Sequence, residues 1–383
     1  MTGFGIQTLP YGAFRVGTEP ARIGVAIGDS VLDLAPALGD DVFAAATLNP
    51  FLARGRAAWT RTRERLLELL THEVALQAAE PHLIPRQDVT LCLPFEVADY
   101  VDFYSNEHHA TNVGRMFRPD ADPLPVNWKS LPAGYHGRSG TVVVSGTPIT
   151  RPLGQYRGPD GVTFGPEPRL DIEVELGFVV GTPTTPGTRL SADDLAEHVF
   201  GVVLLNDWSA RAIQAWEYTP LGPFLGKSFA TSISPWVVPV DALDAARVPA
   251  PTQDPTPLPY LQPAGAGFDI SFEVLLNDTA VSAPQFRDQY WTPGQQLAHL
   301  TVGGAPLRVG DLFASGTVSG PQRDQRGCFL ELSWNGTEPI ALADGSTRTF
   351  LADGDTVTIR ATAPGPDGGP IHLGEVSGTV YST

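Results

Sequence analysis

Turn-forming residues limit the folds open to this chain more than any other feature of its sequence. Forty glycines and 36 prolines are spread over 383 residues, and only 17% of the residues are charged. Glycine and proline interrupt long helices, and a low charged fraction means that much of the chain is packed rather than solvated. The combination favours a mainly β (α+β) enzyme with long loops over a helical bundle.

The overall charge argues against some classes of partner. With a formal net charge of −17, the chain has no evident basic face for nucleic acid or an anionic membrane. A small anionic substrate is compatible with this charge, because it needs only a local positive pocket. The sequence has two cysteines, no run of 18 apolar residues, and no signal-peptide pattern in its first twenty residues. We therefore expect a soluble, cytoplasmic protein without a disulfide framework or a membrane span.

Hydropathy patterns divide the chain into two units. Residues 1–94 form the first unit, with short strands expected at 13–15, 22–27 and 30–34 and a helix over 60–79. In the second unit, residues 95–383, glycine- and proline-rich turns alternate with short apolar runs, as is typical of a mainly antiparallel sandwich or roll. The strands expected there are residues 141–145, 172–180, 201–205, 236–239, 268–276, 311–314, 329–334 and 356–360. The expected helices are residues 108–116, 192–199, 208–216 and 285–299, the last interrupted by a proline at 293.

Acidic side chains beside apolar strands are candidates for a metal site. In the segment DIEVEL, residues 171–176, alternate residues face the same side of a strand, so its carboxylates, including Glu173 and Glu175, line one face. Such charges repel one another unless water screens them or a cation joins them. Asp102 in an aromatic-rich loop and Asp207 after an apolar run are further candidates. Oxygen ligands favour Mg²⁺ or Ca²⁺ over Zn²⁺. Taken singly, each carboxylate also fits a solvated strand face or a helix N-cap.

Two adjacent histidines offer a general base. On a helix His108 and His109 point about 100° apart, so at most one of them faces a site. A general base needs one ring nitrogen free and the other held by a partner. Glu331, which alternates with apolar neighbours, fits that partner or an exposed strand residue. A structural role is the competing interpretation for the histidine.

Basic residues stand out because the chain has only 25 of them, and Arg118, Arg211 and Lys227 are the notable ones. Lys227 lies in the sequence LGKS, which superficially resembles a phosphate loop. The upstream glycine that such a loop requires is missing, so we reject nucleotide binding. Gly316 and Thr317 offer N–H groups and a hydroxyl to an anion, or form an ordinary turn.

Several longer motifs resemble those of one known family. The most specific block is GVVLLNDWSARAIQAWEYTPLGPFLGKSFATSISPWVVP; others are DYVDFYSNEHHATNVGRMFR, LPAGYHGRSGTVVVSGTPI, LDIEVELGFVVG, LRVGDLFASGTVSG and LELSWNGT. From about residue 99 to the C-terminus the chain resembles the fumarylacetoacetase (fumarylacetoacetate hydrolase) family, and the first 90 residues match more weakly. Glu107 and His108 depart from the family pattern, which has a basic and an amide residue there.

The resemblance implies a fold, an activity and a set of site residues. The fold would be a small N-terminal SH3-like barrel followed by a mixed β-sandwich roll, assembled as a homodimer. The activity would be metal-dependent hydrolysis of the carbon–carbon bond of 4-fumarylacetoacetate to fumarate and acetoacetate, ending tyrosine and phenylalanine breakdown. Carried over by position, the metal ligands are Asp102, Glu173, Glu175 and Asp207; the base and its partner are His109 and Glu331; the groups around the leaving fragment are Arg211, Gln214 and Lys227; and the substrate contacts are Tyr104, Arg118, Tyr135, Tyr218 and Thr317.

Two alternatives remain at this stage. A related acylpyruvate hydrolase, or a diketo-acid decarboxylase or isomerase of the same fold, would need the same metal chelation but not the same base. A metal-stabilised binding protein without turnover would need the carboxylates alone. The combination of histidine, lysine and arginine with the carboxylates favours an enzyme, and the pair of His109 and Glu331 favours the hydrolase.

Overall fold

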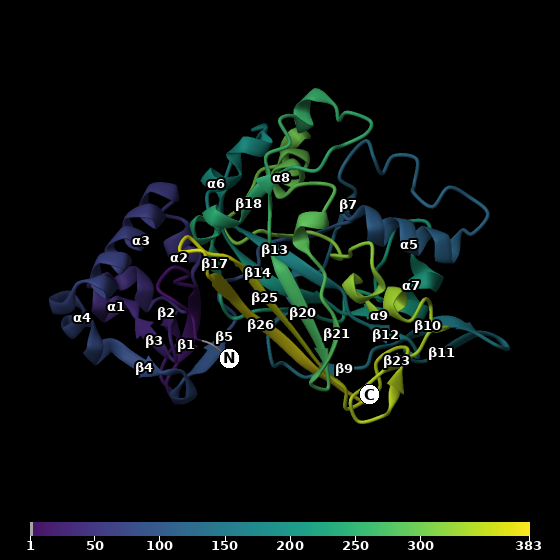
Figure 1. Ribbon diagram of the computed structural model, residues 1–383, viewed down its shortest axis with the longest axis horizontal. Helices are drawn as coiled ribbons and strands as arrows, with labels where there is room; N and C mark the ends of the chain where they lie inside the picture. The colour runs from purple at the N-terminus through teal and green to yellow at the C-terminus, as the bar shows by residue number, and fades with distance from the viewer. Residues whose placement is uncertain (1–2) are drawn as a thin grey trace.

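A computed structural model describes residues 3–383 and shows a small N-terminal unit beside a larger β-rich body (Figure 1). The N-terminal unit contains a five-stranded antiparallel sheet in the order β4-β3-β2-β1-β5, curled into half of a barrel. Its strands are β1 (Tyr11–Arg15), β2 (Arg22–Ile27), β3 (Ser30–Asp33), β4 (Leu83–Pro85) and β5 (Thr90–Cys92).

Helices lie along this sheet in Figure 1, and two of them also face the larger body, where Phe51 and Trp59 pack against Phe200. The helices are α1 (Leu34–Leu38), α2 (Asn49–Leu52), α3 (Arg56–Thr71) and α4 (Glu73–Ala79). The single helix expected over residues 60–79 is therefore two helices, because His72 is extended and separates α3 from α4. One extended residue leaves the leucine spacing on either side intact, so the sequence pattern did not reveal the break.

The larger body is built on a mixed eight-stranded sheet. Its strands run in the order β7-β6-β22-β13-β14-β16-β8, and β17 pairs with β14. The pairs β6–β22 and β8–β16 are parallel. The strands are β6 (Tyr100–Phe103), β7 (Gly134–His136), β8 (Val142–Val144), β13 (Val174–Val180), β14 (Val199–Asp207), β16 (Thr231–Ile233), β17 (Val238–Pro239) and β22 (Leu312–Ala314). Both central strands are buried along their whole length, which explains their nearly continuous apolar sequence.

A second large sheet packs against the first. Its order is β21-β20-β25-β26-β9, and its apolar side chains share one core with those of β13 and β14. The strands are β9 (Ile149–Thr150), β20 (Ser271–Leu276), β21 (Thr279–Ser282), β25 (Thr356–Pro364) and β26 (Pro370–Tyr381). Small two-stranded pairs complete the body: β10 (Leu153–Gly158) with β11 (Gly161–Pro166), β12 (Leu170–Asp171) with β15 (Ser209–Ala210), β18 (Arg247–Pro249) with β19 (Ala266–Phe268), and β23 (Ile340–Ala341) with β24 (Thr347–Arg348). The mainly β fold class is confirmed. The boundary between residues 94 and 95 stays a proposal.

The helices of the larger body correct several expectations. They are α5 (Glu107–Phe117), α6 (Leu195–His198), α7 (Arg211–Glu217), α8 (Pro293–Val302) and α9 (Phe329–Leu332). The strand expected at 329–334 is wrong, because α9 lies there. The helix expected over 285–299 begins only at Pro293, where Thr292 forms a capping box and proline suits the first turn. The helix expected at 208–216 begins at Arg211, since β15 occupies the residues before it.

Figure 1 places α5, α7 and α9 at the end of the body away from the N-terminal unit. Those three helices carry much of the candidate site. Among the residues that the structure describes, no helix has the length and apolar character needed to cross a membrane.

Candidate active site

Three strands of the eight-stranded sheet bring four carboxylates together. Asp102 lies on β6, Glu175 on β13 and Asp207 at the end of β14, while Glu173 immediately precedes β13. One oxygen from each side chain lies within 4.8 Å of the others. All four residues are at most 5% exposed. Asp171, expected on the same face as Glu173 and Glu175, is not part of this group, because the strand is interrupted between β12 and β13.

Burial and mutual repulsion determine the charge state of this cluster. Burial, followed by the charge of Asp207, raises the pKa of Asp102 well above its usual value. Burial and the neighbouring aspartates also raise the pKa of Glu175, and burial raises that of Asp207. Burial would raise the pKa of Glu173 too, but Lys227 and Arg211 lower it to about 2. A cation among these side chains would offset the repulsion that raises the other three pKa values.

Two basic side chains partly neutralise the cluster. The Lys227 ammonium donates to Glu173 and, at 2.9 Å, to Asp207 Oδ2. Arg211 donates from Nη1 to Glu173 Oε1 at 2.7 Å and to Gln214 Oε1 at 3.2 Å. Its second terminal nitrogen, Nη2, is buried and has no partner among the described residues, so it remains available as a donor.

The cluster fits a divalent cation on two grounds. The ligand set is made of oxygen atoms alone, as hard cations require. In addition, Asp102 Oδ1 and Glu175 Oε1 are buried and accept no hydrogen bond within the described part of the chain. Buried oxygens without a partner are costly, and a bound cation would satisfy both of them. The buried acidic cluster can therefore bind a metal.

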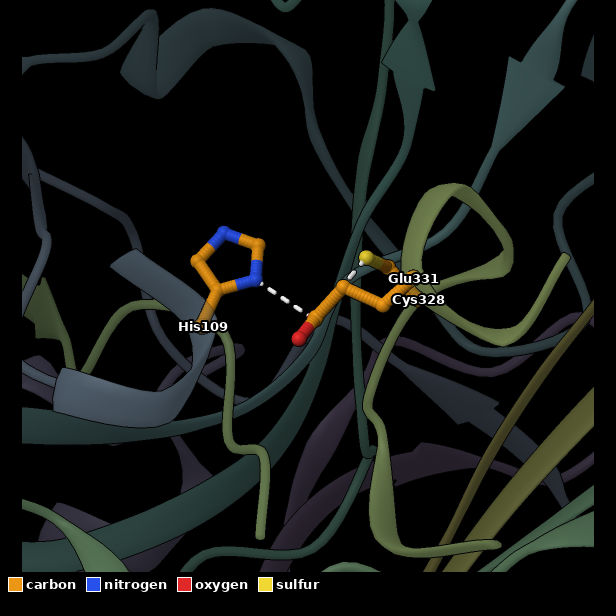
Figure 2. A group of neighbouring side chains, drawn as sticks. All are labelled: His109, Cys328 and Glu331. Atoms are coloured by element: carbon orange, nitrogen blue, oxygen red, sulfur yellow. Dashed lines mark hydrogen bonds and ion pairs between the residues drawn. The ribbon is translucent and has the colours of Figure 1, made fainter. Parts of the chain in front are cut away.

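A histidine–carboxylate pair lies beside the cluster. His109, near the start of α5, places Nδ1 2.6 Å from Glu331 Oε2, and both side chains are buried. Figure 2 shows the other ring nitrogen turned away from Glu331. Nδ1–H donating to the carboxylate leaves Nε2 as the proton acceptor. His109 is close enough to Glu173 for its charge to lower the pKa of that carboxyl.

Glu331 is held by several donors besides the histidine. Asn112 Nδ2 donates to Oε1 at 2.8 Å, and Ser319 Oγ donates to Oε2 at 2.7 Å. The Cys328 thiol lies 3.2 Å from Oε2 (Figure 2). Burial would raise the pKa of Glu331, but His109 and these hydrogen bonds lower it to about 2. The carboxylate is thus charged and fixed beside the ring.

His108 lies in different surroundings from His109. It is partly exposed, and its charge acts on Asp288. Burial raises the pKa of Asp288, and the charge of His108 partly offsets that rise. The two adjacent histidines therefore have different surroundings, as helical geometry predicts.

The remaining predicted residues lie around the cluster at different depths. Tyr104 packs edge-on against the His109 ring with centroids 5.4 Å apart, and Tyr135 hydrogen-bonds Asp102. Thr317 is buried just after β22. Arg118 is exposed and donates to the Pro123 carbonyl at 2.7 Å. Tyr218, just after the last residue of α7, is 55% exposed.

A cavity of about 260 Å³ reaches the cluster from the side of β7. Tyr135, Asp207, Phe224, Lys227 and Thr231 are among its lining residues. It gives a small molecule access to the carboxylate of Asp207 and the ammonium group of Lys227.

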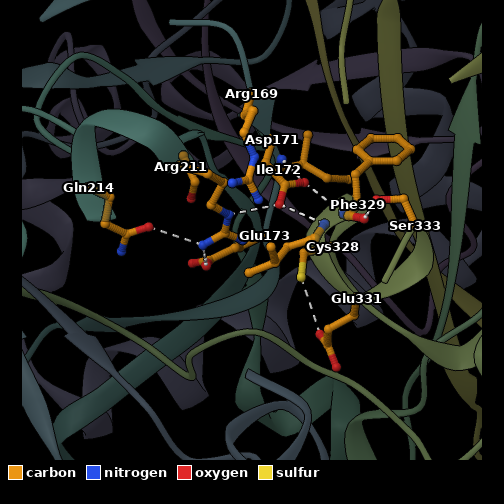
Figure 3. Close-up of polar contacts among 12 residues, drawn as sticks. Arg169, Asp171, Ile172, Glu173, Arg211, Gln214, Cys328, Phe329, Glu331 and Ser333 are labelled. Carbon is orange, nitrogen blue, oxygen red and sulfur yellow. Dashed lines mark hydrogen bonds and ion pairs between the residues drawn. The ribbon is translucent and has the colours of Figure 1, made fainter. Parts of the chain in front are cut away.

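Sequence reasoning missed the residues that support these groups. Asp171 bonds Arg211 and the start of α9 (Figure 3), and Asn112, Ser319 and Cys328 surround Glu331. In the sequence these residues show only as polar side chains within apolar segments. Such a pattern does not indicate which distant residue is the partner.

Sequence comparison decides the family. The C-terminal model of fumarylacetoacetate (FAA) hydrolase matches residues 100–381, and the fumarylacetoacetase N-terminal model matches residues 7–94. The chain belongs to the fumarylacetoacetate hydrolase family. Among members of this family, the fumarylacetoacetase of Homo sapiens is 48% identical over 98% of this chain and 96% of its own length. Those of Caenorhabditis elegans and Arabidopsis thaliana are 46% and 44% identical, each over 98% of this chain and 96% and 95% of their own lengths.

Several solved structures have the same fold as this member of the fumarylacetoacetate hydrolase family. The fumarylacetoacetate hydrolase of Exiguobacterium antarcticum has a TM-score of 0.59 at 19% identity, covering 98% of this chain and 100% of its own. The maleylpyruvate hydrolase of Sphingobium sp. SYK-6, in complex with manganese(II) and pyruvate, has a TM-score of 0.54 at 17% identity. The match covers 97% of this chain and 99% of that one.

Proposed function

We propose that this chain hydrolyses the carbon–carbon bond of 4-fumarylacetoacetate to fumarate and acetoacetate, the activity of a fumarylacetoacetase. The observation that carries the proposal is the buried pair of His109 and Glu331, 2.6 Å apart, beside a cluster of four buried carboxylates. Identity of 48% to the human fumarylacetoacetase over 98% of the chain supports the same substrate.

Hydrolysis begins with activation of a water molecule. Nε2 of His109 takes a proton from water as the oxygen attacks the carbonyl carbon of the fumaroyl group. Glu331 holds Nδ1–H, which fixes the tautomer and stabilises the imidazolium that forms. The same logic operates in Ser-His-Asp triads, with water here in place of serine.

Collapse of the tetrahedral oxyanion breaks the carbon–carbon bond. The electron pair leaves with the acetoacetate fragment as an enolate, and a proton returned to its carbon completes the products. Lys227, the free Nη2 of Arg211 and the amide of Gln214 supply positive charge and hydrogen-bond donors to the oxyanion and the enolate. Tyr104, Arg118, Tyr135, Tyr218 and Thr317 are proposed to position the substrate.

Asp102, Glu173, Glu175 and Asp207 would hold the divalent cation, and we propose Mg²⁺ or Ca²⁺ for it. When bound, the cation supplies Lewis-acid polarisation of the two substrate carbonyls. The role of the protein in that chemistry is to hold four oxygen ligands in a buried site.

An assay with chelator control tests the proposal. Purified protein should remove the diketo-acid absorbance of fumarylacetoacetate and release fumarate and acetoacetate in equal amounts. A chelator should abolish turnover, and added Mg²⁺ or Ca²⁺ should restore it. Release of carbon dioxide, or an isomer without cleavage, would favour a decarboxylase or isomerase of the same fold. Metal binding without turnover would favour a binding protein.

Other expectations from the sequence are also proposals. We propose that the chain forms a homodimer, that it acts in the cytoplasm, and that residues 1–94 and 95–383 are its two domains. Sedimentation of the purified chain tests the dimer, and limited proteolysis at residues 94 and 95 tests the domain boundary.

A further inference from the structure

One buried carboxyl group joins the two halves of the candidate site. Asp171, fully buried at the end of β12, accepts four hydrogen bonds. Oδ1 accepts from the backbone N–H groups of Ile172 at 2.8 Å and Phe329 at 2.7 Å. Oδ2 accepts from Arg211 Nε at 2.8 Å and from the N–H of Leu330 at 2.9 Å. Figure 3 shows Asp171 between Arg211 on one side and the start of α9 on the other.

The bonds to α9 fix the helix that carries Glu331. A helix begins with N–H groups that lack partners within it, and these are usually satisfied by the N-cap side chain. The N-cap of α9 is Cys328, whose side chain makes no cap hydrogen bond. Asp171 supplies the missing acceptor from more than 150 residues earlier in the chain, at Phe329 and Leu330. Because α9 has only four residues, its position depends strongly on these two bonds.

The bond to Arg211 fixes the guanidinium. With Nε held by Asp171 and Nη1 held by Glu173 and Gln214, only Nη2 lacks a partner in the described chain. The planar group cannot rotate without breaking these bonds, so the free donor points in one direction.

We propose that Asp171 is a positioning residue that sets Glu331, through α9, and the free donor of Arg211 at the same time. It touches neither substrate nor the reacting atoms in this role. The catalytic part of the proposal rests on the proposed hydrolase function, whereas the structural part, the fixing of α9, does not.

The structural part is tested without any assay of turnover. In Asp171→Asn one carboxylate oxygen becomes an NH₂ donor, so whichever way the amide points, two of the four N–H donors lose their acceptor. Cys328 reports on the result, because it is buried at the start of α9 beside Glu331 and burial raises the pKa of its thiol well above the usual value. A Cys92→Ser background leaves it as the single thiol.

Asp355 offers a matched control. It is 2% exposed and, like Asp171, accepts hydrogen bonds from an arginine side chain and a backbone N–H, from Arg348 and Ala352. Under native conditions, Asp171→Asn should increase the rate at which an aromatic disulfide reagent labels Cys328 by at least about tenfold, as expected for loss of buried hydrogen bonds. Asp355→Asn should change it by less than about threefold. Equal labelling rates in the two variants would overturn the proposal.

The kinetic part uses a double-mutant comparison. Asp171→Asn should lower kcat by about 10- to 100-fold per folded molecule and raise KM, whereas Asp355→Asn should leave kcat within about twofold. Because Asp171 acts on water activation through Glu331 and separately on the donor of Arg211, adding Asp171→Asn to Glu331→Gln should lower kcat by a factor at least about threefold smaller than in wild type, and the remaining loss measures the Arg211 share. Fully multiplicative effects would overturn the proposed route.

Two safeguards keep the outcomes distinct. If Asp171→Asn does not fold, Asp171→Ser is used, because its smaller side chain removes the carboxylate and leaves room for water to accept the N–H groups; the same labelling and kinetic results are expected. If the wild-type protein does not cleave fumarylacetoacetate, the proposed function fails, while the labelling rate still decides whether Asp171 fixes α9.

Discussion

At the scale of single residues, the chemistry depends on which side chains are charged and where they are held. The sequence offered His109, Lys227 and the four acidic residues as candidates, but each was ambiguous by itself, and the family resemblance assigned them to one site. The supporting residues gave no signal at all, since a serine or asparagine gains its role only from a partner. Asn112 and Ser319 bond Glu331 from 219 and 12 residues away, and nothing in their local sequence indicates it.

The two adjacent histidines should differ sharply on substitution. We expect His109→Gln to lower kcat by about 100- to 10,000-fold with substrate binding largely kept, because a general base contributes about that much. His108→Gln is the matched control and should stay within a few-fold of wild type, since Glu331 is bonded by His109 and the charge of His108 acts on Asp288 instead. Steady-state kinetics and a substrate-binding measurement decide the outcome. A severe His108→Gln variant beside a mild His109→Gln variant would assign the base to the other ring.

Glu331 should also make stability depend on pH. Its pKa falls from an ordinary 4.5 to about 2 on folding, so its charged form favours the native state. That contribution, on the order of 3 kcal/mol, is fully present above about pH 4.5 and disappears as the pH falls towards 2. The difference in unfolding free energy between wild type and Glu331→Gln should therefore be largest at pH 6 and clearly smaller at pH 3. Urea unfolding of both proteins at several pH values measures this, and a constant gap would contradict it.

At the scale of elements, the strands with regular apolar runs were predictable and the short helices were not. The strand expected at residues 329–334 followed from apolar alternation, yet the chain forms α9 there because Asp171 caps it through space. The break at His72 and the helix start at Pro293 likewise depend on backbone geometry and capping. β26, the longest strand described, was missed because two glycines lie within it and its alternation is broken at Gly374 and Glu375.

Gly114 links α5 to the loop that Arg118 contacts. A Cβ at this position would lie 1.9 Å from the Pro123 carbonyl oxygen, which Arg118 holds at 2.7 Å. Gly114→Ala gains about 1 kcal/mol of helix propensity at most, but the overpacking costs about 1–3 kcal/mol and displaces the loop. We expect KM to rise more than kcat falls, together with a lower Tm. Gly140→Ala is the control, because no atom lies within 4 Å of its new Cβ. Unchanged KM in Gly114→Ala would remove this loop from substrate binding.

At the scale of the whole molecule, the eight-stranded sheet holds charged groups inside an apolar body, and the second large sheet packs against it. The carboxylates come from β6, β13 and β14, and the histidine–glutamate pair comes from two helices at the end away from the N-terminal unit (Figure 1). Composition predicted the fold class, because turn-rich chains with few charges form packed β structures. The pairing of strands distant in sequence was supplied by family resemblance rather than by local pattern.

Cation binding should therefore stabilise the whole fold. A ligand at 100 times its Kd stabilises a protein by about 2.7 kcal/mol, which corresponds to a rise of several degrees in Tm. We expect Mg²⁺ or Ca²⁺ to raise the Tm of chelator-treated protein, and Glu175→Gln to lose most of that rise because it removes one charged ligand. Glu331→Gln, a buried carboxylate outside the cluster, should keep it. A full Tm rise in Glu175→Gln would exclude that residue from the metal site.

Oxygen transfer from solvent tests the central claim of carbon–carbon bond hydrolysis most directly. When fumarylacetoacetate is turned over in water enriched in oxygen-18, water activated by His109 attacks the carbonyl carbon of the fumaroyl group. Mass spectrometry of fumarate collected within a few turnovers should then show one solvent oxygen in the newly formed carboxyl group, with none required in the carboxyl group of acetoacetate. Fumarate without solvent oxygen, or a product with the carbon–carbon bond intact, would contradict the account.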